Sequence, residues 1–191
     1  TEVIAEAGIN HNGSVDTALS MVDVASNAGA DCVKFQTFVA NRLAVDSAKM
    51  AEYQIKNTGV LEPQINMLKR LELPTDHFLT LQKYCGDLDI DFLSSPFDIE
   101  SAQFLISELG LQRIKIPSGE ITNEPLLHEI GKMKIKVFLS TGMSSLDEIK
   151  RALSTLQSRG TPKKNISILH CHSEYPSTFK DLNLKSMLTL K

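Results

Sequence analysis

Lysines lie inside two short apolar segments of the 191-residue chain, and a polar turn follows one of them. Lys34 stands in residues 31–38 (DCVKFQTF), and Lys115 stands in residues 113–120 (RIKIPSGE). Lys115 near Ser118 can bind a phosphate, because the ammonium supplies charge while the hydroxyl and the turn amides donate hydrogen bonds. Burial also lowers the pKa of a lysine, so either lysine could instead form a Schiff base with a carbonyl substrate. The sequence leaves both chemistries open.

A carboxylate interrupts the apolar segment near the start of the chain. Glu6 lies within the sequence VIAEAG, and an amide and an imidazole, those of Asn10 and His11, follow in the next turn. An isolated charge is costly to bury, because it loses its hydration without gaining a partner. We therefore expect Glu6 either to form an ion pair with a lysine of the same sheet or to take part in chemistry.

Further polar side chains stand near the ends of neighbouring apolar segments. Gln36 shares a face with Lys34, because alternate residues of a strand point to the same side. Ser95 and Ser140 close two later segments, LSSPFD and FLSTGM. Each serine taken singly could merely cap the helix that follows. Polar groups at several successive segment ends favour one common site.

A last set of polar residues lies at residues 169–176 (LHCHSEYP), where the sixth apolar segment ends. His170 and His172 are two residues apart, so in a strand they face the same side and could share a metal ion. The sequence offers no identifiable third ligand nearby, and a histidine at a strand end is often only hydrogen-bonded. The residues alone therefore favour hydrogen-bonded histidines over a metal site.

The segments that carry these residues have the length and composition of β-strands. We place strands at residues 2–7, 32–37, 91–95, 113–117, 137–141 and 166–171. Amphipathic helical windows alternate with them, which predicts repeated βα units and a parallel sheet. Six such units fit either a doubly wound sheet or an incomplete barrel. We favour the α/β class with a parallel (β/α)8 TIM-type barrel, because side chains from several of its strands converge at the carboxyl end.

For two of the expected helices, the sequence contains clear signals for the buried face and for a helix end. The first lies between the first two strands, ends at Gly29 and has an apolar stripe made of Val15, Ala18, Leu19, Val22 and Ala25. The second follows the fifth strand and begins with a capping box formed by Ser145 and Glu148. Its expected buried stripe, before Gly160, consists of Leu146, Ile149, Leu153 and Leu156.

An insertion separates the second and third strands, which are about twice as far apart as the others. It covers about residues 39–73 and contains a helix-like stretch at 63–71 and a loop at 56–59 (KNTG). Long βα loops usually serve function, so we expect this excursion to lie over one end of the barrel.

Composition excludes several classes of protein. The net charge of −3 and the pI near 5.9 argue against nucleic-acid binding, which usually requires a clustered basic face. No apolar run is long enough to span a membrane and no signal peptide opens the chain, so we expect a cytoplasmic protein. Cys32, Cys85 and Cys171 lack metal-site spacing, and we interpret them as reduced core thiols. The chain begins at Thr1 and stops at Lys191 within a helix-like stretch, which favours a longer natural protein.

Six blocks of this sequence, taken in order, closely resemble the sialic acid synthase family, including its legionaminic acid synthases. The blocks are IAEAGINHNG (4–13), VKFQTF (33–38), FLSSPFD (92–98), KIPSGEITN (115–123), LSTGMS (139–144) and LHCHSEYP (169–176). They extend over nearly the whole chain. The resemblance implies a transferase that condenses phosphoenolpyruvate with an N-acetylated amino sugar, of the N-acetylmannosamine type, to give a nonulosonic (sialic) acid and phosphate.

Residue roles follow from the resemblance block by block. Lys115, Ser118 and Ser140 resemble the group that holds the phosphate and carboxylate of phosphoenolpyruvate, with Ser95 assisting. Gln36, Glu120 and Tyr175 resemble contacts to the acetylated sugar. Glu6 resembles the carboxylate beside the reacting atoms, and either Glu6 or Glu120 could transfer protons. Ser173 stands where family members often carry Asn or Thr, so its ligand contact is a separate expectation.

The resemblance also implies what surrounds this chain. Residues 1–191 correspond to the phosphoenolpyruvate-binding barrel, truncated before strands seven and eight, with the antifreeze-like C-terminal domain absent. The family's full-length enzymes are homodimers. They use a divalent metal, Mn or Mg, as a Lewis acid on the sugar aldehyde, and its histidine ligands are expected beyond the end of this chain.

Three alternatives stay open at this point. The sugar could be a diacetylated dideoxy hexose, as for a legionaminic or pseudaminic acid synthase. The chain could be a Schiff-base barrel aldolase that uses Lys115 or Lys34 and no metal. It could also be a fragment without catalytic activity, because two strands and a covering domain are expected to be missing.

Overall fold

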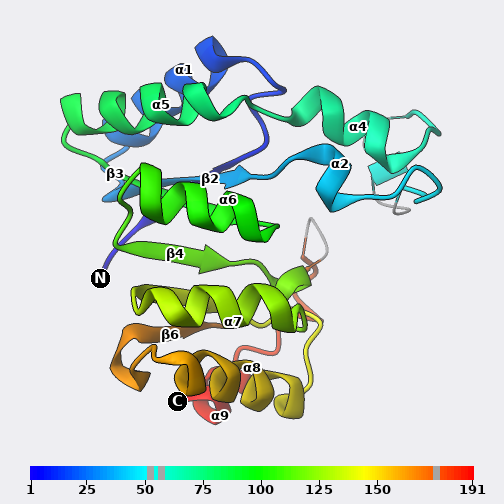
Figure 1. Ribbon diagram of the computed structural model, residues 1–191, viewed down its shortest axis with the longest axis vertical. Coiled ribbons are helices and arrows are strands. Elements are labelled where there is room, and N and C mark those ends of the chain that lie inside the picture. The colour runs from blue at the N-terminus through cyan, green and yellow to red at the C-terminus, as the bar shows by residue number, and fades with distance from the viewer. Residues whose placement is uncertain (51–53, 56–58, 174–176) are drawn as a thin grey trace. The chain divides into compact units, whose positions relative to one another are not determined.

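The computed structural model describes residues 1–50, 54–55, 59–173 and 177–191. Its contacts divide the chain into two compact units, Thr1–Leu111 and Gln112–Lys191. Each unit is a small parallel sheet with helices, and each is described separately below (Figure 1).

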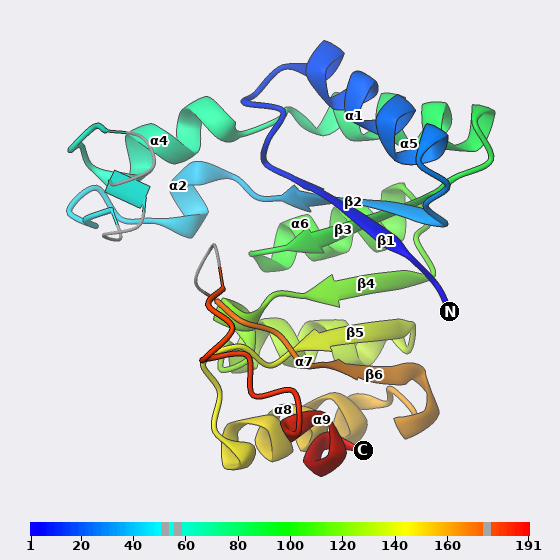
Figure 2. The same ribbon diagram turned by 180° about the vertical axis from the view of Figure 1, so that it is seen from behind.

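The first unit contains three parallel strands in consecutive order. They are β1 (Ile4–Gly8), β2 (Cys32–Thr37) and β3 (Asp91–Pro96). Helices α1 (Val15–Asn27) and α5 (Thr75–Asp87) pack on each other over this sheet, as Figure 2 shows from behind. After β3 the chain forms α6 (Ile99–Gln103), which continues as a π-helical turn at Phe104–Glu108.

Helix α1 forms where the sequence predicted a crossover helix. The Ser14 hydroxyl accepts a hydrogen bond from the amide of Thr17 at 3.2 Å and caps the first turn. The helix ends at Asn27, and Gly29 follows with φ of +77°, a left-handed conformation that glycine adopts without strain. The phenol of Tyr84 on α5 donates to the Asp23 carboxylate of α1 at 2.6 Å, so the two helices are joined by a polar contact. The predicted helix is confirmed.

The insertion after β2 folds around an apolar cluster of its own. It contains α2 (Ala40–Leu43) and α4 (Gln64–Leu71), which confirms the helix predicted at 63–71. The buried members of the cluster are Phe38, Ala40, Met50, Ile65, Met67 and Leu68. The predicted loop at 56–59 lies largely outside the described residues.

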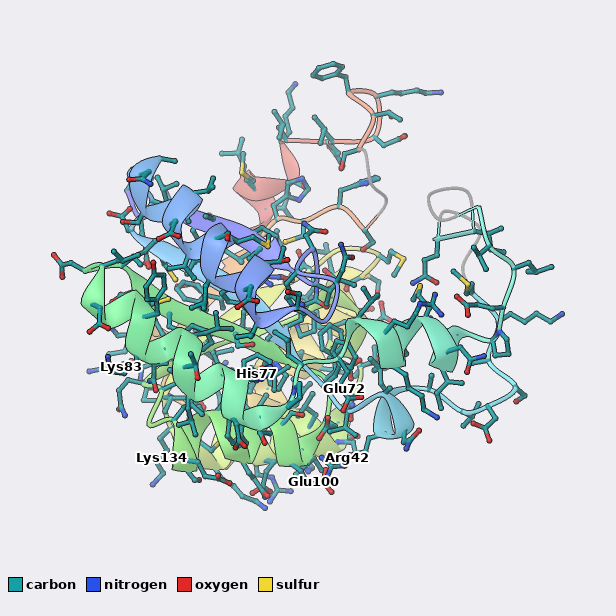
Figure 3. The ribbon with its side chains drawn as sticks, turned by 90° about the horizontal axis from the view of Figure 1, so that it is seen from above. Arg42, Glu72, His77, Lys83, Glu100 and Lys134 are labelled. Carbon is teal, nitrogen blue, oxygen red and sulfur yellow. The ribbon has the colours of Figure 1, made fainter. Side chains whose placement is uncertain are left out.

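One polar contact joins the two ends of the insertion to each other, and Arg42 joins it to the segment that follows β3. The Glu72 carboxylate accepts a hydrogen bond from the Ala40 amide at 2.8 Å. This bond joins the residue that directly follows α4 to the first residue of α2. Arg42 lies 3.3 Å from the Asp98 carboxylate and 4.0 Å from that of Glu100, and Figure 3 labels Arg42, Glu72 and Glu100. These contacts join the described residues of the insertion to one another and to the segment that follows β3.

The second unit repeats the same architecture. Its strands β4 (Arg113–Ile116), β5 (Lys136–Ser140) and β6 (Ile166–Leu169) are parallel and consecutive in order. Helices α7 (Glu124–Met133) and α8 (Leu146–Arg159) pack on each other. Short 3₁₀ turns at Ser118–Glu120 and Lys163–Asn165 and the helix α9 (Ser186–Leu190) complete the unit.

All six predicted strands are present, and β2 matches the prediction at both ends. The other strands differ from the prediction by one or two residues at an end. The largest differences are at residues 2–3, which precede β1, and at residues 170–171, which follow β6. A doubly wound sheet reverses its strand order at a switch point. Each unit contains three strands in consecutive order, which fits both a barrel and one half of a doubly wound sheet.

The capping box of α8 is confirmed. The Ser145 hydroxyl accepts from the Glu148 amide at 3.3 Å, and the Glu148 carboxylate accepts from the Ser145 amide at 2.8 Å. These hydrogen bonds lower the pKa of Glu148, because they stabilise its charged form. The predicted stripe is wrong at Leu146, which is 49% exposed in the first turn, whereas Ala152 is buried beside Ile149 and Leu156.

The cysteine interpretation is correct for two of the three residues. Cys32 and Cys85 are buried free thiols, and burial raises the pKa of Cys85 to about 12. Cys171 is only half-buried, because β6 ends at Leu169 and leaves this residue in the following loop. None of the helices in the described ranges is long and apolar enough to cross a bilayer.

We expect Gly131→Ala to destabilise the protein by about 1–3 kcal/mol, the usual cost of overpacking a close contact. A Cβ at Gly131 of α7 would lie 2.6 Å from the Arg159 Cβ and 3.0 Å from the Leu156 carbonyl oxygen of α8. In an open helix position the same change stabilises by about 1 kcal/mol, so the sign of the effect reports the helix contact.

Urea unfolding of Gly131→Ala and of a control variant would measure this change in the free energy of unfolding. Gly86→Ala in α5 is the matched control, because nothing lies within 4 Å of the added carbon. It is expected to be neutral or slightly stabilising. Equal behaviour of the two variants would contradict the close packing of α7 on α8.

Candidate active site

Lys34 is the centre of a polar cluster in the first unit. Its ammonium lies 2.8 Å from the Glu6 carboxylate and donates at 3.4 Å to the hydroxyl of Ser95 and to the carbonyl oxygen of Phe35. Strand register explains the arrangement, because Glu6 of β1 is paired with Lys34 of β2, and the next residue on the same face of β2, Gln36, is paired with Ser95 of β3.

The two partners of this ion pair differ in exposure. The Lys34 side chain is 3% exposed, whereas the Glu6 side chain is 51% exposed. The ammonium is thus held away from water, and the carboxylate opens toward solvent. The expected ion pair between Glu6 and a lysine of the same sheet is confirmed.

Gly8 provides space beside this cluster. Its φ is +57°, and a Cβ there would lie 2.9 Å from the Glu6 carboxylate oxygen and 3.8 Å from the Gln36 amide nitrogen. Glu6 and Gln36 therefore both border the small volume at Gly8. The first unit brings together Glu6, Gln36 and Ser95, three of the predicted site residues.

The sequence places Lys34 on one face of a strand with Gln36 and allows it as a Schiff-base residue, but Lys34 was not counted among the expected site residues. The structure buries Lys34 almost completely, with 2% of the whole residue exposed, between Glu6 and Ser95. The shared face with Gln36 was therefore a signal for its place in the cluster.

Serine hydroxyls gather around the Gly142 backbone in the second unit. The Ser118 hydroxyl accepts a hydrogen bond from the Gly142 amide at 3.0 Å. A Cβ at Gly142 would overlap the Ser173 hydroxyl and lie 2.9 Å from that of Ser118. Ser118 and Ser173, from the loops after β4 and β6, therefore both border Gly142, just beyond the end of β5.

Two serine hydroxyls of the second unit are buried and lack a hydrogen-bond partner among the described residues. They belong to Ser140, the last residue of β5, and to Ser173. Leaving a buried polar group unsatisfied costs about 1–3 kcal/mol. Such groups point to a ligand or a bound water that completes their hydrogen bonds. The second unit thus presents hydroxyl groups suited to an oxyanion.

Lys115 lies on the face of β4 opposite to the fully buried Ile114 and Ile116. Phe138 of β5 is its neighbour in the sheet register. Lys115 is half-buried, and it precedes Ser118 by three residues on the way to the carboxyl end of the strand. Its position agrees with an anion-binding lysine, and no described contact assigns it a different role.

Glu120 is held by the cap of the next helix. Its carboxylate accepts from the Asn123 side-chain amide at 2.6 Å, and Asn123 in turn caps α7 through the Leu126 amide at 3.2 Å. Glu120 therefore has a fixed position just before the N-terminus of α7. Tyr175 falls outside the described residues.

The possible metal-binding role of the histidine pair is not supported at His170. One of its ring nitrogens lies 2.7 Å from the Leu182 carbonyl oxygen, and the other lies 3.1 Å from the Ser186 hydroxyl. Both nitrogens are thus engaged. Across residues 1–50, 54–55, 59–173 and 177–191, no three His, Cys, Asp or Glu side chains form a group that could hold a metal ion. The described residues do not fit the divalent metal that the resemblance implies.

Each unit therefore has a polar cluster at the carboxyl ends of its strands. Glu6, Gln36 and Ser95 meet in the first unit, and Ser118 and Ser173 meet in the second, with Ser140 close by in sequence. The expectation that Glu6 shares one rim with Lys115, Ser118 and Ser140 stays a prediction, because it joins residues of different units.

Comparison with known proteins shows the family. The model of the NeuB family matches residues 21–191, and the chain belongs to this family. An N,N'-diacetyllegionaminic acid synthase of Campylobacter jejuni is 47% identical over 191 residues, which are 100% of this chain and 57% of the relative. The enzyme of the same name from Legionella pneumophila is 44% identical over 98% of this chain and 53% of its own length.

A solved structure agrees with these relatives. The N-acetylneuraminic acid synthetase of Leptospira borgpetersenii, crystallised with citrate, superposes with a TM-score of 0.84 at 32% identity. It covers 100% of this chain, which matches 61% of the solved chain. The chain spans between half and two thirds of the length of these relatives. The predicted α/β class, an incomplete parallel TIM-type barrel with six βα units, is confirmed.

Proposed function

We propose that this chain is the phosphoenolpyruvate-binding part of an enzyme that condenses phosphoenolpyruvate with an N-acetylated amino sugar. The products are a nonulosonic acid and phosphate. One observation supports this proposal most directly: in a member of the NeuB family, the Ser140 and Ser173 hydroxyls are buried without a described partner, and Ser173 lies with Ser118 beside Gly142. A phosphate or carboxylate would accept hydrogen bonds from these groups.

In this proposal the second unit binds the donor. The Lys115 ammonium supplies positive charge, and the Ser118 and Ser140 hydroxyls donate to the phosphate and carboxylate oxygens, with Ser95 of the first unit assisting. Hydroxyl groups preset around a backbone turn need little rearrangement when the anion binds, which favours affinity. We further propose that Gln36, Glu120, Ser173 and Tyr175 contact the acetylated sugar.

The proposed reaction begins when C3 of phosphoenolpyruvate attacks the aldehyde carbon of the open-chain sugar. A carbon–carbon bond forms, and the aldehyde oxygen takes up a proton. Water then adds to C2, loses a proton and gives a tetrahedral intermediate that expels phosphate. Glu6 or Glu120 would transfer these protons, since a carboxylate near bound substrate can act as acid or base. The solvent-facing side of the Glu6 carboxylate supports its access to reactants.

We propose that residues 1–191 form the barrel portion of a longer, homodimeric cytoplasmic enzyme, with strands seven and eight and an antifreeze-like domain outside this chain. We also propose that the enzyme uses a divalent metal, Mn or Mg, whose histidine ligands lie outside this chain. We assign no step of the reaction to the metal here.

A diacetylated sugar is the second candidate substrate. The relatives at 47% and 44% identity are both named for N,N'-diacetyllegionaminic acid, which favours the diacetylated dideoxy hexose of the legionaminic type over a pseudaminic one. N-acetylmannosamine stays the first candidate substrate, and it undergoes the same class of reaction. The insertion at residues 39–73 is where we expect contacts that distinguish the two sugars.

We expect the full-length protein, given phosphoenolpyruvate and manganese, to release inorganic phosphate with one of these sugars and to release little without sugar. Phosphate release, followed separately with N-acetylmannosamine and with the diacetylated hexose, identifies the substrate. If no acetylated amino sugar supports release, the proposed function is wrong.

The aldolase alternative is weakened for Lys34. An amine must be neutral to attack a carbonyl, and the Glu6 carboxylate at 2.8 Å stabilises the charged ammonium instead. Borohydride treatment with substrate traps a Schiff base covalently, so absence of a labelled lysine in an active preparation excludes this mechanism.

A further inference from the structure

Arg113 stacks on an aromatic ring in the sheet of the second unit. Its guanidinium carbon lies 5.9 Å from the centroid of the Phe138 ring. This distance is within the range of a cation–π contact. Phe138 is also the register neighbour of Lys115, so the stack adjoins the lysine that we propose to bind the donor.

The strand register shows how these three side chains share one face. Ile114 and Ile116 of β4 and Val137 and Leu139 of β5 are at most 1% exposed. Because side chains alternate along a strand, Arg113, Lys115 and Phe138 project from the other face of the sheet.

Arg113 leans toward the carboxyl end of the sheet. Its own register neighbour is Lys136, two residues before Phe138 on the same face of β5. Its guanidinium nevertheless lies over the ring of Phe138, which is the register neighbour of Lys115. Arg113 and Lys115 therefore adjoin the same aromatic ring.

We propose that the Arg113–Phe138 stack is a positioning device for Lys115. The ring fills the space beside the lysine stem, and the guanidinium blocks the direction toward the amino end of the strand. The Lys115 ammonium is then directed to the carboxyl end, where the Ser118 turn begins. This inference rests on the proposed function, because it concerns the binding of the anionic donor.

Alternatively, the stack could only fill space on this face of the sheet. A filling role predicts lower stability, with affinity for phosphoenolpyruvate unchanged in the folded protein. A positioning role predicts a higher KM for phosphoenolpyruvate with a nearly unchanged kcat, since Lys115 keeps its charge but loses its preferred direction. The split between KM and kcat therefore separates the two roles.

Steady-state kinetics of the full-length protein with phosphoenolpyruvate as the varied substrate would test the proposal. We expect Arg113→Met to raise KM by roughly five- to tenfold and to lower kcat by less than about threefold, because binding is weakened more than chemistry. Phe138→Ala should have a similar effect. Arg113→Lys keeps a cation that can stack on the ring, and Phe138→Tyr keeps the ring, so both should recover most of the affinity.

Lys136→Met is the matched control, because Lys136 is an exposed cation on the same face and directly opposite Arg113. It should leave KM within twofold of the unmodified protein. The positioning role is wrong if Arg113→Met and Phe138→Ala leave KM unchanged, or if Lys136→Met raises it equally. Phosphate release by the unmodified protein keeps this outcome distinct from a failure of the proposed function.

Discussion

Lys115→Ala is expected to weaken phosphoenolpyruvate binding by roughly 30- to 300-fold. Removing one member of a desolvated charge pair typically costs about 2–5 kcal/mol, and each 1.4 kcal/mol is a factor of about ten in the dissociation constant. Lys115 is half-buried, so solvent screens it less than a surface lysine, and the lower part of this range applies. Calorimetric titration of the full-length protein with phosphoenolpyruvate measures the change.

Lys136→Ala is the control for the loss of a lysine as such. Lys136 is exposed at the start of β5, away from the serine hydroxyls, so its removal should change the affinity by less than about twofold, as for a screened surface charge. Circular dichroism and the unfolding midpoint would show that both variants fold. Unchanged affinity in Lys115→Ala would rule out the proposed anion-binding role.

The strands and helices of this chain could be predicted because their signals are local. β2 matches the prediction at both ends, since its residues 32–37 are bounded by an alanine–aspartate pair and by the long insertion. The capping box at Ser145 depends on two side chains three residues apart, so it too is readable from sequence. β6 was predicted two residues too long, because apolar composition alone did not mark the point where pairing with β5 ends.

The contacts within the candidate site depended on register, which no local pattern gives. Glu6 and Lys34 are 28 positions apart in sequence, and they meet because β1 pairs with β2 in one particular alignment. A shift of one residue would place one of them on the opposite face. The same holds for Ser173, whose approach to Gly142 depends on where the loop after β6 turns. Residue types indicated a possible chemistry, and only the fold could give the contacts between the side chains.

We expect the two members of the Glu6–Lys34 pair to respond unequally to substitution. Glu6→Ala removes the carboxylate 2.8 Å from an ammonium that is 3% exposed, and we expect a loss of about 2–3 kcal/mol in the free energy of unfolding. Lys34→Met replaces the buried cation with an apolar chain of similar length and leaves a carboxylate that is 51% exposed and can be hydrated. Its expected cost is less than about 1 kcal/mol, because replacing a buried charge by an apolar group is often neutral.

The double variant tests this asymmetry directly. If burial of the ammonium causes the loss, Glu6→Ala combined with Lys34→Met should be more stable than Glu6→Ala alone, because the buried charge is gone. Urea unfolding of the three variants and the unmodified protein completes a double-mutant cycle and gives the coupling energy. Equal losses for the two single variants, or additive losses in the double variant, would contradict the ion pair as the reason that Lys34 can be buried. Phosphate release should fall in all three variants, so a stable but inactive double variant would separate the contribution of this pair to folding from its contribution to the reaction.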